Sequence, residues 1–309
     1  SSKETKQPSH SISKQDASRR WSLLLALLLV ISAVLHFIYL TKPESVVFDE
    51  VHFGKFGTFY CCTGENFFDI HPPHAKLLIA AAVGPTGYKG GFDFKDIALP
   101  FPDNVPVFAF RSVPALVGVL LTLIIFVLIR QLGGSEAAAF LGAALYTFDN
   151  AFLVQTRHIL LDGILLVAIF SSISAYLGAM RTERAGRRVG LLILAGAMAG
   201  LAVGSKHTGL TALGLIAVII MVRIFQDFSG RNALKWIRSY IWVVSGAVAV
   251  YLLGWYLHFM LLSQPGLGDA FYQTKGHFFE DVLNLHRVML NANFSITVPH
   301  PDASPWWSW

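Results

Sequence analysis

Residues 21–40 read WSLLLALLLVISAVLHFIYL, and residues 41–56, which follow directly, read TKPESVVFDEVHFGKF. The first stretch is long enough to cross a bilayer as an α-helix, because about 20 apolar residues span ~30 Å of hydrocarbon. The second stretch carries an acidic pair, Asp49 and Glu50, among aromatic and apolar residues just beyond that helix. The sequence therefore predicts a membrane helix followed by a charged segment at the boundary between membrane and water.

The rest of the chain repeats the apolar pattern. It is 54% hydrophobic and only 14% charged, a balance in which a soluble domain could not cover its surface with polar groups. Six further stretches have the length of a membrane helix: 107–129, 136–155, 160–180, 189–204, 208–225 and 239–262. The second of these six contains Asp149 and Asn150, and the fourth is rich in Gly and Ala, which favours close helix packing in a membrane. We predict an all-α integral membrane protein with about seven transmembrane helices, a module over residues 21–262.

The distribution of Lys and Arg predicts the orientation. Residues 1–20 have no apolar periodicity and are predicted to be a disordered, cytoplasmic tail. Basic residues then recur in every second loop: Arg130, Arg181, Arg184, Arg187, Arg188, Arg223, Arg231, Lys235 and Arg238. By the positive-inside rule these loops are cytoplasmic, so the long loop 41–106 and the segment 263–309 are exoplasmic. Topology thus explains the net charge of +5 without a nucleic-acid partner.

The exoplasmic loop 41–106 is long enough to carry function. A carboxylate at the membrane boundary is partly desolvated, so the pKa of Asp49 should be raised and its side chain should be a better base. Glu50 would point about 100° away from Asp49 on a helix, so we expect separate roles rather than a shared proton. Pro72 and Pro73 favour the start of a short interfacial helix over the apolar residues that follow.

Two smaller features leave alternatives open. Asp69, His71 and His74 could hold a metal ion, but positioning roles fit their spacing as well, and we expect no metal. The adjacent Cys61 and Cys62 do not easily reach disulfide geometry, which favours free or intermolecular thiols.

Three cations are expected near the exoplasmic ends of helices: Arg111, Arg157 and Lys206. Each could lift its charge to the interface along its own side chain. Together, beside a basic carboxylate, they favour a phosphate-bearing lipid substrate, since charges at the membrane boundary are functional candidates. If a sugar leaves that phosphate, cations stabilise the leaving group and the carboxylate takes the proton of the acceptor hydroxyl.

Several segments, in order along the chain, resemble the protein O-mannosyltransferase family. They are Phe48–Gly54, His71–Pro73 with Lys76–Leu78, Arg111 with Pro114–Leu116, Gln155–Arg157 with Leu161–Asp162, Gly204–Gly209, and His300–Trp309. That family has the GT-C membrane fold and moves mannose, with inversion, from a polyprenyl-phosphate carrier such as dolichyl phosphate mannose to Ser or Thr of exported proteins. The carrier lipid is a substrate, and no cofactor is implied.

The resemblance also implies roles for residues. Asp49 would be the catalytic base, with Glu50 as its supporting partner. Four cations would bind the donor phosphate or brace the site: Arg111, Arg157, Lys206 and Lys76. Asp162 would hold Arg157, and His71 and His74 would support the site.

The resemblance leaves the setting less closely defined. Relatives carry more helices after the tryptophan-rich segment, so this chain would be the amino-terminal module of a longer enzyme. Eukaryotic members place a β-trefoil domain in the loop after the seventh helix, whereas here only residues 263–303 precede Ser304, which favours a prokaryotic member in a bacterial plasma membrane. A eukaryotic member would lie in the endoplasmic reticulum membrane. The exported acceptor polypeptide is the expected partner, and the secretion machinery is a further candidate.

Two alternative functions remain. A GT-C enzyme could use another sugar or a lipid acceptor at the same site. A transporter of lipid-linked sugars is less favoured, because the charges gather at one face and the sequence has no internal repeat.

Overall fold

The computed structural model describes residues 14–295, and this part of the chain is helical, with two isolated β-bridges and no strand. The α-helices in chain order are α1 (Lys14–Phe37), α2 (Glu50–Thr58), α3 (His74–Val83), α4 (Val107–Gln131), α5 (Glu136–Phe148), α6 (Asn150–Arg157), α7 (Asp162–Arg181), α8 (Ala185–Ser205), α9 (Leu210–Gln226), α10 (Gly230–Leu261) and α11 (Phe278–Ser295). A π-helical turn, Phe59–Thr63, continues α2, and 3-10 turns occupy Gly84–Thr86, His207–Gly209 and Leu267–Ala270. The all-α prediction is confirmed.

The predicted number of membrane spans is also confirmed. Six described helices are long and apolar enough to cross a membrane: α1, α4, α7, α8, α9 with its preceding turn, and α10. A seventh span results if α5 and α6, which meet at a bend of 62°, are counted together.

Two boundaries differ from the prediction. Helix α1 begins at Lys14, so residues 14–20 are helical and not part of a disordered tail, while residues 1–13 of that tail lie outside the described residues. Helix α10 begins at Gly230, so Arg231, Lys235 and Arg238 lie on a helix. The Ser229 hydroxyl caps this helix by accepting a hydrogen bond from the Asn232 N–H, a local signal that outweighs the charged composition.

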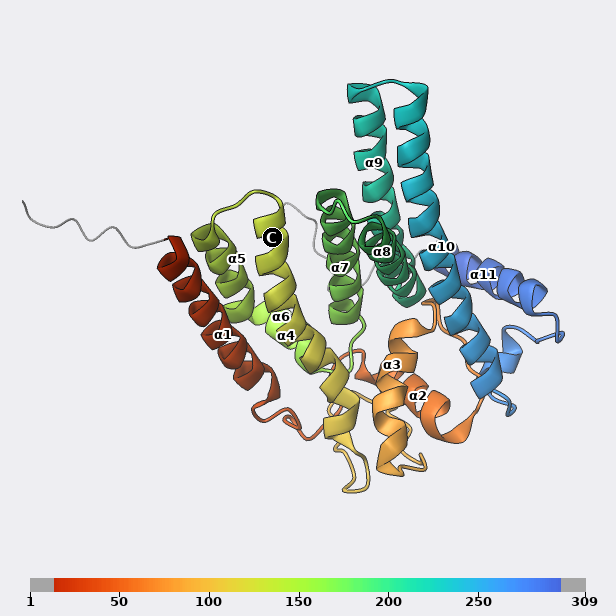
Figure 1. The fold of residues 1–309 in the computed structure, drawn as a ribbon. Helices are drawn as coiled ribbons and strands as arrows, with labels where there is room; N and C mark the ends of the chain where they lie inside the picture. Colours follow the sequence, from red (N-terminus) through yellow and green to blue (C-terminus); the bar gives the residue numbers. More distant parts are fainter. Residues whose placement is uncertain (1–13, 296–309) are drawn as a thin grey trace, which may run out of the picture.

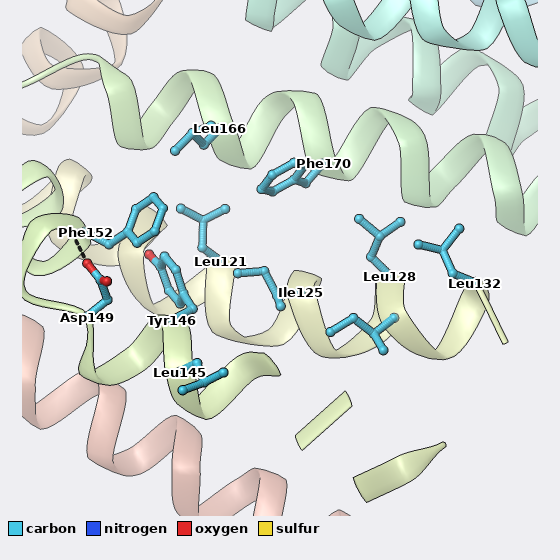
Figure 2. Close-up of a pocket in the computed structure, with 11 residues that line it drawn as sticks. Leu121, Ile125, Leu128, Leu132, Leu145, Tyr146, Asp149, Phe152, Leu166 and Phe170 are labelled. Atoms are coloured by element: carbon cyan, nitrogen blue, oxygen red, sulfur yellow. Dashed lines mark hydrogen bonds between the residues drawn. The ribbon is translucent and has the colours of Figure 1, made fainter. Parts of the chain in front are cut away.

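The bend between α5 and α6 follows from Asp149. Its carboxylate accepts a hydrogen bond from the Phe152 N–H at 3.1 Å and so caps α6, while its backbone is extended and ends α5. Beside the bend a cavity of about 400 Å³ lies between α4, α5, α6 and α7. Figure 2 shows Asp149 at one end of this cavity, Leu132 at the other, and apolar side chains between them.

Small residues bring α8 and α10 together, as the Gly and Ala content of α8 indicated. A Cβ atom on Gly196 would lie 1.9 Å from the Val243 carbonyl oxygen, and one on Gly200 would lie 2.4 Å from the Ala247 carbonyl oxygen. The backbones of the two helices are therefore in direct contact, an arrangement that any larger side chain would prevent.

The two ends of the helix bundle are built differently. At one end, the loop end, residues 38–106 gather with the turns that precede α7 and α9, and α3 packs against α4, α8 and α10. At the other end lie the turns joining α4 to α5, α7 to α8 and α9 to α10. We call it the arginine end, because these turns and the helix ends beside them carry Arg130, Arg181, Arg184, Arg187, Arg188, Arg223 and Arg231. Figure 1 shows α2 and α3 below the bundle and the α9–α10 turn at its top.

Candidate functional site

Asp49 and Glu50 have separate environments although they are adjacent. Glu50 is the first residue of α2 and its side chain is 0% exposed, whereas Asp49 precedes the helix and is only partly buried. The expectation that the two carboxylates do not share a proton agrees with this geometry.

A buried ion pair fixes Glu50 to Arg111 of α4. The Arg111 Nε and Nη2 atoms each lie 2.8 Å from a Glu50 carboxylate oxygen, and both side chains are 0% exposed. The remaining N–H groups of Arg111 donate to the carbonyls of Leu40, Pro43 and Ser45. A guanidinium has five N–H groups, and here all of them have protein acceptors. Arg111 therefore braces the start of the loop and has no N–H left for a donor phosphate.

Further contacts complete the environment of Glu50. Its carboxylate accepts hydrogen bonds from the backbone N–H groups of Val47 at 2.9 Å and Ile159 at 3.0 Å, and the His158 Nδ1 atom lies 3.6 Å away. Burial alone would raise the pKa of Glu50, but the His158 ring and the donors from Arg111 and Ile159 lower it to about 2. Glu50 is thus an ionised structural carboxylate that ties the loop to α4 and to the turn before α7.

Asp49, in contrast, faces an open cavity of about 360 Å³. Its wall consists of Asp49, His52, Phe53, Phe56, Phe68, Asp69, Ile70 and His71. Burial raises the pKa of Asp49, electrostatic interactions with His52 and Lys206 oppose the rise, and the carboxylates of Asp162 and Asp69 add to it. A carboxylate with a raised pKa at the wall of a cavity is suited to act as a general base.

Lys206 and Asp162 form an ion pair close enough to affect the Asp49 carboxylate. The Lys206 Nζ atom lies 2.8 and 2.9 Å from the two Asp162 oxygens, and the side chains are 21% and 40% exposed. The expectation that Asp162 holds Arg157 is therefore wrong in this structure. Asp162 begins α7 and faces the end of α8, while Arg157 turns back toward α1.

Arg157 caps the end of α1. It donates hydrogen bonds to the carbonyl of Leu35, at 2.9 Å, and to that of Ile38. The last carbonyls of a helix have no partner within the helix, so a cation there satisfies them and matches the helix dipole. The Arg157 side chain is partly exposed, and these two bonds leave N–H groups free for another acceptor.

Lys76 lies behind the cavity wall. It is 1% exposed, forms an ion pair with Asp69, and donates to the His71 carbonyl at 2.6 Å. Burial lowers the pKa of Lys76, and Asp69 partly restores it. Burial likewise lowers the pKa of His71 to about 4, so the imidazole on the cavity wall is neutral near neutral pH. Lys76 thus positions Asp69 and is not itself open to the cavity.

His74 points away from Asp69 and His71. Its ring nitrogens lie 3.0 Å from the Gly204 carbonyl oxygen and 2.9 Å from that of Val250, which fixes α3 to α8 and α10. Among residues 14–295 no group of three or more His, Cys, Asp or Glu side chains could hold a metal ion. The three residues considered for a metal therefore do not converge.

The structure corrects the expectation for the cysteines. Cys61 and Cys62 form a disulfide with each other, within the π-helical turn after α2. Adjacent cysteines therefore do reach disulfide geometry in this turn, and neither of the two is a free thiol.

Three contributors to the site were not assigned roles from the sequence. Asp69 and His52 line the cavity with Asp49, and His158 lies against Glu50. The sequence did point toward His158, because it directly follows Arg157, a residue already predicted to belong to the site. Asp69 was considered only as a metal ligand, and its pairing with Lys76 depends on the fold of the loop.

Comparisons with known proteins bear on this site. A family model described as dolichyl-phosphate-mannose–protein mannosyltransferase matches residues 26–263. The chain is 33% identical to dolichyl-phosphate-mannose–protein mannosyltransferase 4 of Candida albicans over 90% of its own length and 38% of the relative. It is 31% identical to mannosyltransferase 1 of Saccharomyces cerevisiae over 87% of its length and 33% of the relative. The chain thus spans well under half the length of these relatives.

Solved structures give the same picture. The Saccharomyces cerevisiae protein O-mannosyltransferase Pmt1–Pmt2 complex bound to the sugar donor matches with a TM-score of 0.77 and 30% identity, over 82% of this chain and 36% of that one. The oligosaccharyltransferase of Archaeoglobus fulgidus matches with a TM-score of 0.56 at 15% identity, over 91% of this chain and 34% of that one, and shows the fold alone. The predicted GT-C fold is confirmed.

The relatives also bear on the source. Matches come from yeasts and from Drosophila melanogaster, so the preference for a prokaryotic member and a bacterial plasma membrane receives no support. The family model covers more than half of the chain and follows it through the Asp49 cavity and its surrounding helices. The chain belongs to the dolichyl-phosphate-mannose–protein mannosyltransferase family.

Proposed function

We propose that the protein transfers mannose from a polyprenyl-phosphate carrier, of the dolichyl-phosphate kind, to Ser or Thr hydroxyl groups of other proteins. Family membership supports the reaction, and one observation in this chain carries it: Asp49, with a raised pKa, lies on an open cavity beside the Lys206–Asp162 pair.

In this reaction the acceptor oxygen forms a bond to C1 of mannose while the C1–O bond to phosphate breaks. The hydroxyl proton passes to the Asp49 carboxylate, and the phosphate leaves with the electron pair. Attack from the face opposite the phosphate inverts the configuration at C1. The leaving phosphate is a weak base, so it needs a nearby positive charge more than a proton.

The contacts favour Lys206 as the cation for that phosphate. Lys206 is partly exposed, and its positive charge is close enough to lower the pKa of Asp49. The Asp162 carboxylate holds the Lys206 Nζ atom in place. Arg157 is the second candidate, because it retains free N–H groups. Arg111 and Lys76 are buried and each forms an ion pair with a neighbouring carboxylate, so we assign them to bracing the loop and positioning Asp69.

We further propose that the loop end faces the exoplasmic side and the amino terminus the cytoplasm. The concentration of Arg and Lys at the arginine end supports this through the positive-inside rule. The endoplasmic reticulum membrane fits the eukaryotic relatives, and an exported polypeptide is then the acceptor.

The test is the Asp49→Asn substitution, which keeps the shape of the side chain and removes its basicity. Membranes containing the full chain receive dolichyl phosphate carrying labelled mannose and a Ser/Thr acceptor peptide. We expect the transfer rate to fall by about 10²–10⁴, the usual contribution of a general base. Expression should stay unchanged.

Asp103→Asn is the matched control, since Asp103 is an exposed carboxylate in the same loop. It should transfer mannose at the rate of the unaltered chain. Full activity in Asp49→Asn would overturn the proposed mechanism.

A further inference from the structure

A third cavity, lined by both polar and apolar residues, lies at the arginine end, away from Asp49. It has a volume of about 490 Å³ and is formed by α4, α7 and α8, with Gln131, Ser174, Gly178, Arg181, Arg187 and Leu191 among its lining residues. We propose that this arginine-end pocket binds an anionic phospholipid of the adjoining membrane leaflet, with the lipid phosphate at Arg181 and Arg187. The proposal does not depend on the transferase reaction.

The pocket exists because one face of α7 carries only small side chains. Ser171, Ser174, Ala175 and Gly178 follow a spacing of three, one and three residues, which places them on the same side of the helix. A Cβ atom on Gly178 would lie 3.6 Å from the Leu191 side chain of α8 and 3.8 Å from that of Gln131 on α4. Gly178 is therefore the floor of a groove whose walls are α4 and α8.

The rim of the pocket is strongly basic. Arg181 ends α7, Arg187 lies in the first turns of α8, and Arg184 and Arg188 flank them. In the described part of the chain none of these four guanidinium groups has a carboxylate within salt-bridge distance. Arg181 donates to the Gln131 carbonyl and so is held at the rim. A planar guanidinium group without a carboxylate partner is well suited to donate two parallel hydrogen bonds to two oxygens of a phosphate.

The inner wall is suited to the other half of a lipid. Ile124, Leu191 and Leu194 line the pocket, and Leu194 is 46% exposed, so the apolar surface continues outward from the cavity. The positive-inside rule accounts for arginines at this end of the bundle, but not for a groove with an apolar wall beneath them. A basic pocket between membrane helices is a known pattern for anionic lipid headgroups.

One polar atom narrows the choice of headgroup. The Oε1 atom of Gln131 is buried and has no hydrogen-bond partner, while the Nε2 atom of the same side chain donates to the Ser174 carbonyl at 3.1 Å. A buried acceptor without a donor is costly. Gln131 lines the pocket, and a rotation of its side chain that exposes this oxygen would let a headgroup with hydroxyl groups, such as that of phosphatidylglycerol or phosphatidylinositol, supply the donor.

The test counts lipids that stay bound. The full chain is reconstituted in vesicles of phosphatidylcholine with a minority of phosphatidylglycerol, extracted in mild detergent, and examined by native mass spectrometry. We expect one retained phosphatidylglycerol per chain. Arg181→Gln with Arg187→Gln should weaken retention by about 30-fold, because each arginine near a membrane surface contributes about fivefold.

The matched control removes two other arginines of the same end, Arg231→Gln with Arg238→Gln. Both are exposed and lie outside the pocket lining, so retention should be unchanged. An equal loss in this control would overturn the proposal and leave only general attraction of anionic lipid to a basic surface.

Gly178→Leu provides a second test that keeps every charge. The larger side chain fills the groove, so phosphatidylglycerol retention should be lost, while thermal unfolding confirms that the variant folds. Retention at the level of the unaltered chain in a folded Gly178→Leu variant would contradict the pocket. If the Gly178→Leu variant does not fold, the comparison of phosphatidylglycerol retention between the Arg181/Arg187 and Arg231/Arg238 double variants decides.

Discussion

Two neighbouring carboxylates, Glu50 and Asp49, have pKa values that are shifted in opposite directions. Glu50 is enclosed by Arg111 and backbone N–H groups, and its pKa is lowered to about 2. Asp49 lies on an open cavity, has a raised pKa, and has no cation bonded directly to it among the described residues. Burial on its own would raise the pKa of both carboxyl groups, so the difference comes from how strongly neighbouring cations and N–H donors compensate each negative charge. A structural carboxylate is fully paired, whereas a basic one must be left incompletely paired.

The largest effect should come from Arg111→Met. The substitution leaves the Glu50 charge buried without its partner, which costs about 3–5 kcal/mol in free energy of unfolding. Thermal or denaturant unfolding in detergent measures it. Arg157→Met is the comparison, since Arg157 bonds only backbone carbonyls, and it should cost less. Equal losses in both variants would remove the distinction between a buried pair and a helix cap.

Lys206→Met should separate activity from stability. If Lys206 stabilises the leaving phosphate, the transfer rate falls by about 10²–10³, the effect of removing one electrostatic contact from a transition state. The ion pair with Asp162 is partly exposed, so unfolding should change by about 1 kcal/mol or less. A Lys206→Met variant with normal kcat would assign the phosphate to Arg157 instead.

Gly204→Ala should disturb the wall of the cavity through His74. A Cβ atom at Gly204 would lie 2.1 Å from the His74 ring, which holds α3 in place. Overpacking of this kind costs about 1–3 kcal/mol, measured by thermal unfolding. Gly214→Ala is the control, because nothing lies within 4 Å of a Cβ there. That variant should be as stable as the unaltered chain or slightly more stable.

The smallest effects should appear as a difference between two pH profiles. The folded pKa of Glu50, about 2, lies below its ordinary value of 4.5, so its stabilisation is complete above pH 4.5 and is lost as the pH falls toward 2. The pKa of Asp49 is raised from 3.8, so the basic form needed for transfer is lost at a higher pH than for an ordinary Asp. As the pH is lowered, the transfer rate should therefore fall first, and the unfolding temperature should fall only at a lower pH. Coincident curves would contradict separate roles.

Much of the fold could be predicted from apolar runs. Their lengths gave the membrane helices, and Asp149 marked the one stretch that the structure breaks, since an Asp can cap a new helix start. The start of α10 could not be located in the same way, because basic residues fit a helix end as well as a loop.

The sequence named charged residues that the structure places at the loop end, but it did not predict their contacts. Arg111 and Lys206 are both single cations near the loop-end termini of helices, yet one is 0% exposed and the other 21%. The difference arises because residues 40–50 fold back over α4 and cover Arg111, a tertiary contact without a local pattern. For the same reason the partner of Asp162 could not be chosen correctly between Arg157 and Lys206.

The break at Asp149 has a consequence for the surrounding lipid. Helix α5 has 13 residues and rises only about 20 Å, and the 8 residues of α6 continue at a bend of 62°, so the broken span is short of the ~30 Å that hydrocarbon tails usually occupy. Helix α10, with 32 residues, exceeds that thickness. Hydrophobic mismatch would therefore thin the bilayer on the α5–α6 flank and not beside α10. Headgroups on the thinned flank would lie deeper and closer to Arg157. The phosphate of the proposed carrier lipid would then have a shorter distance to travel from the headgroup layer to the site.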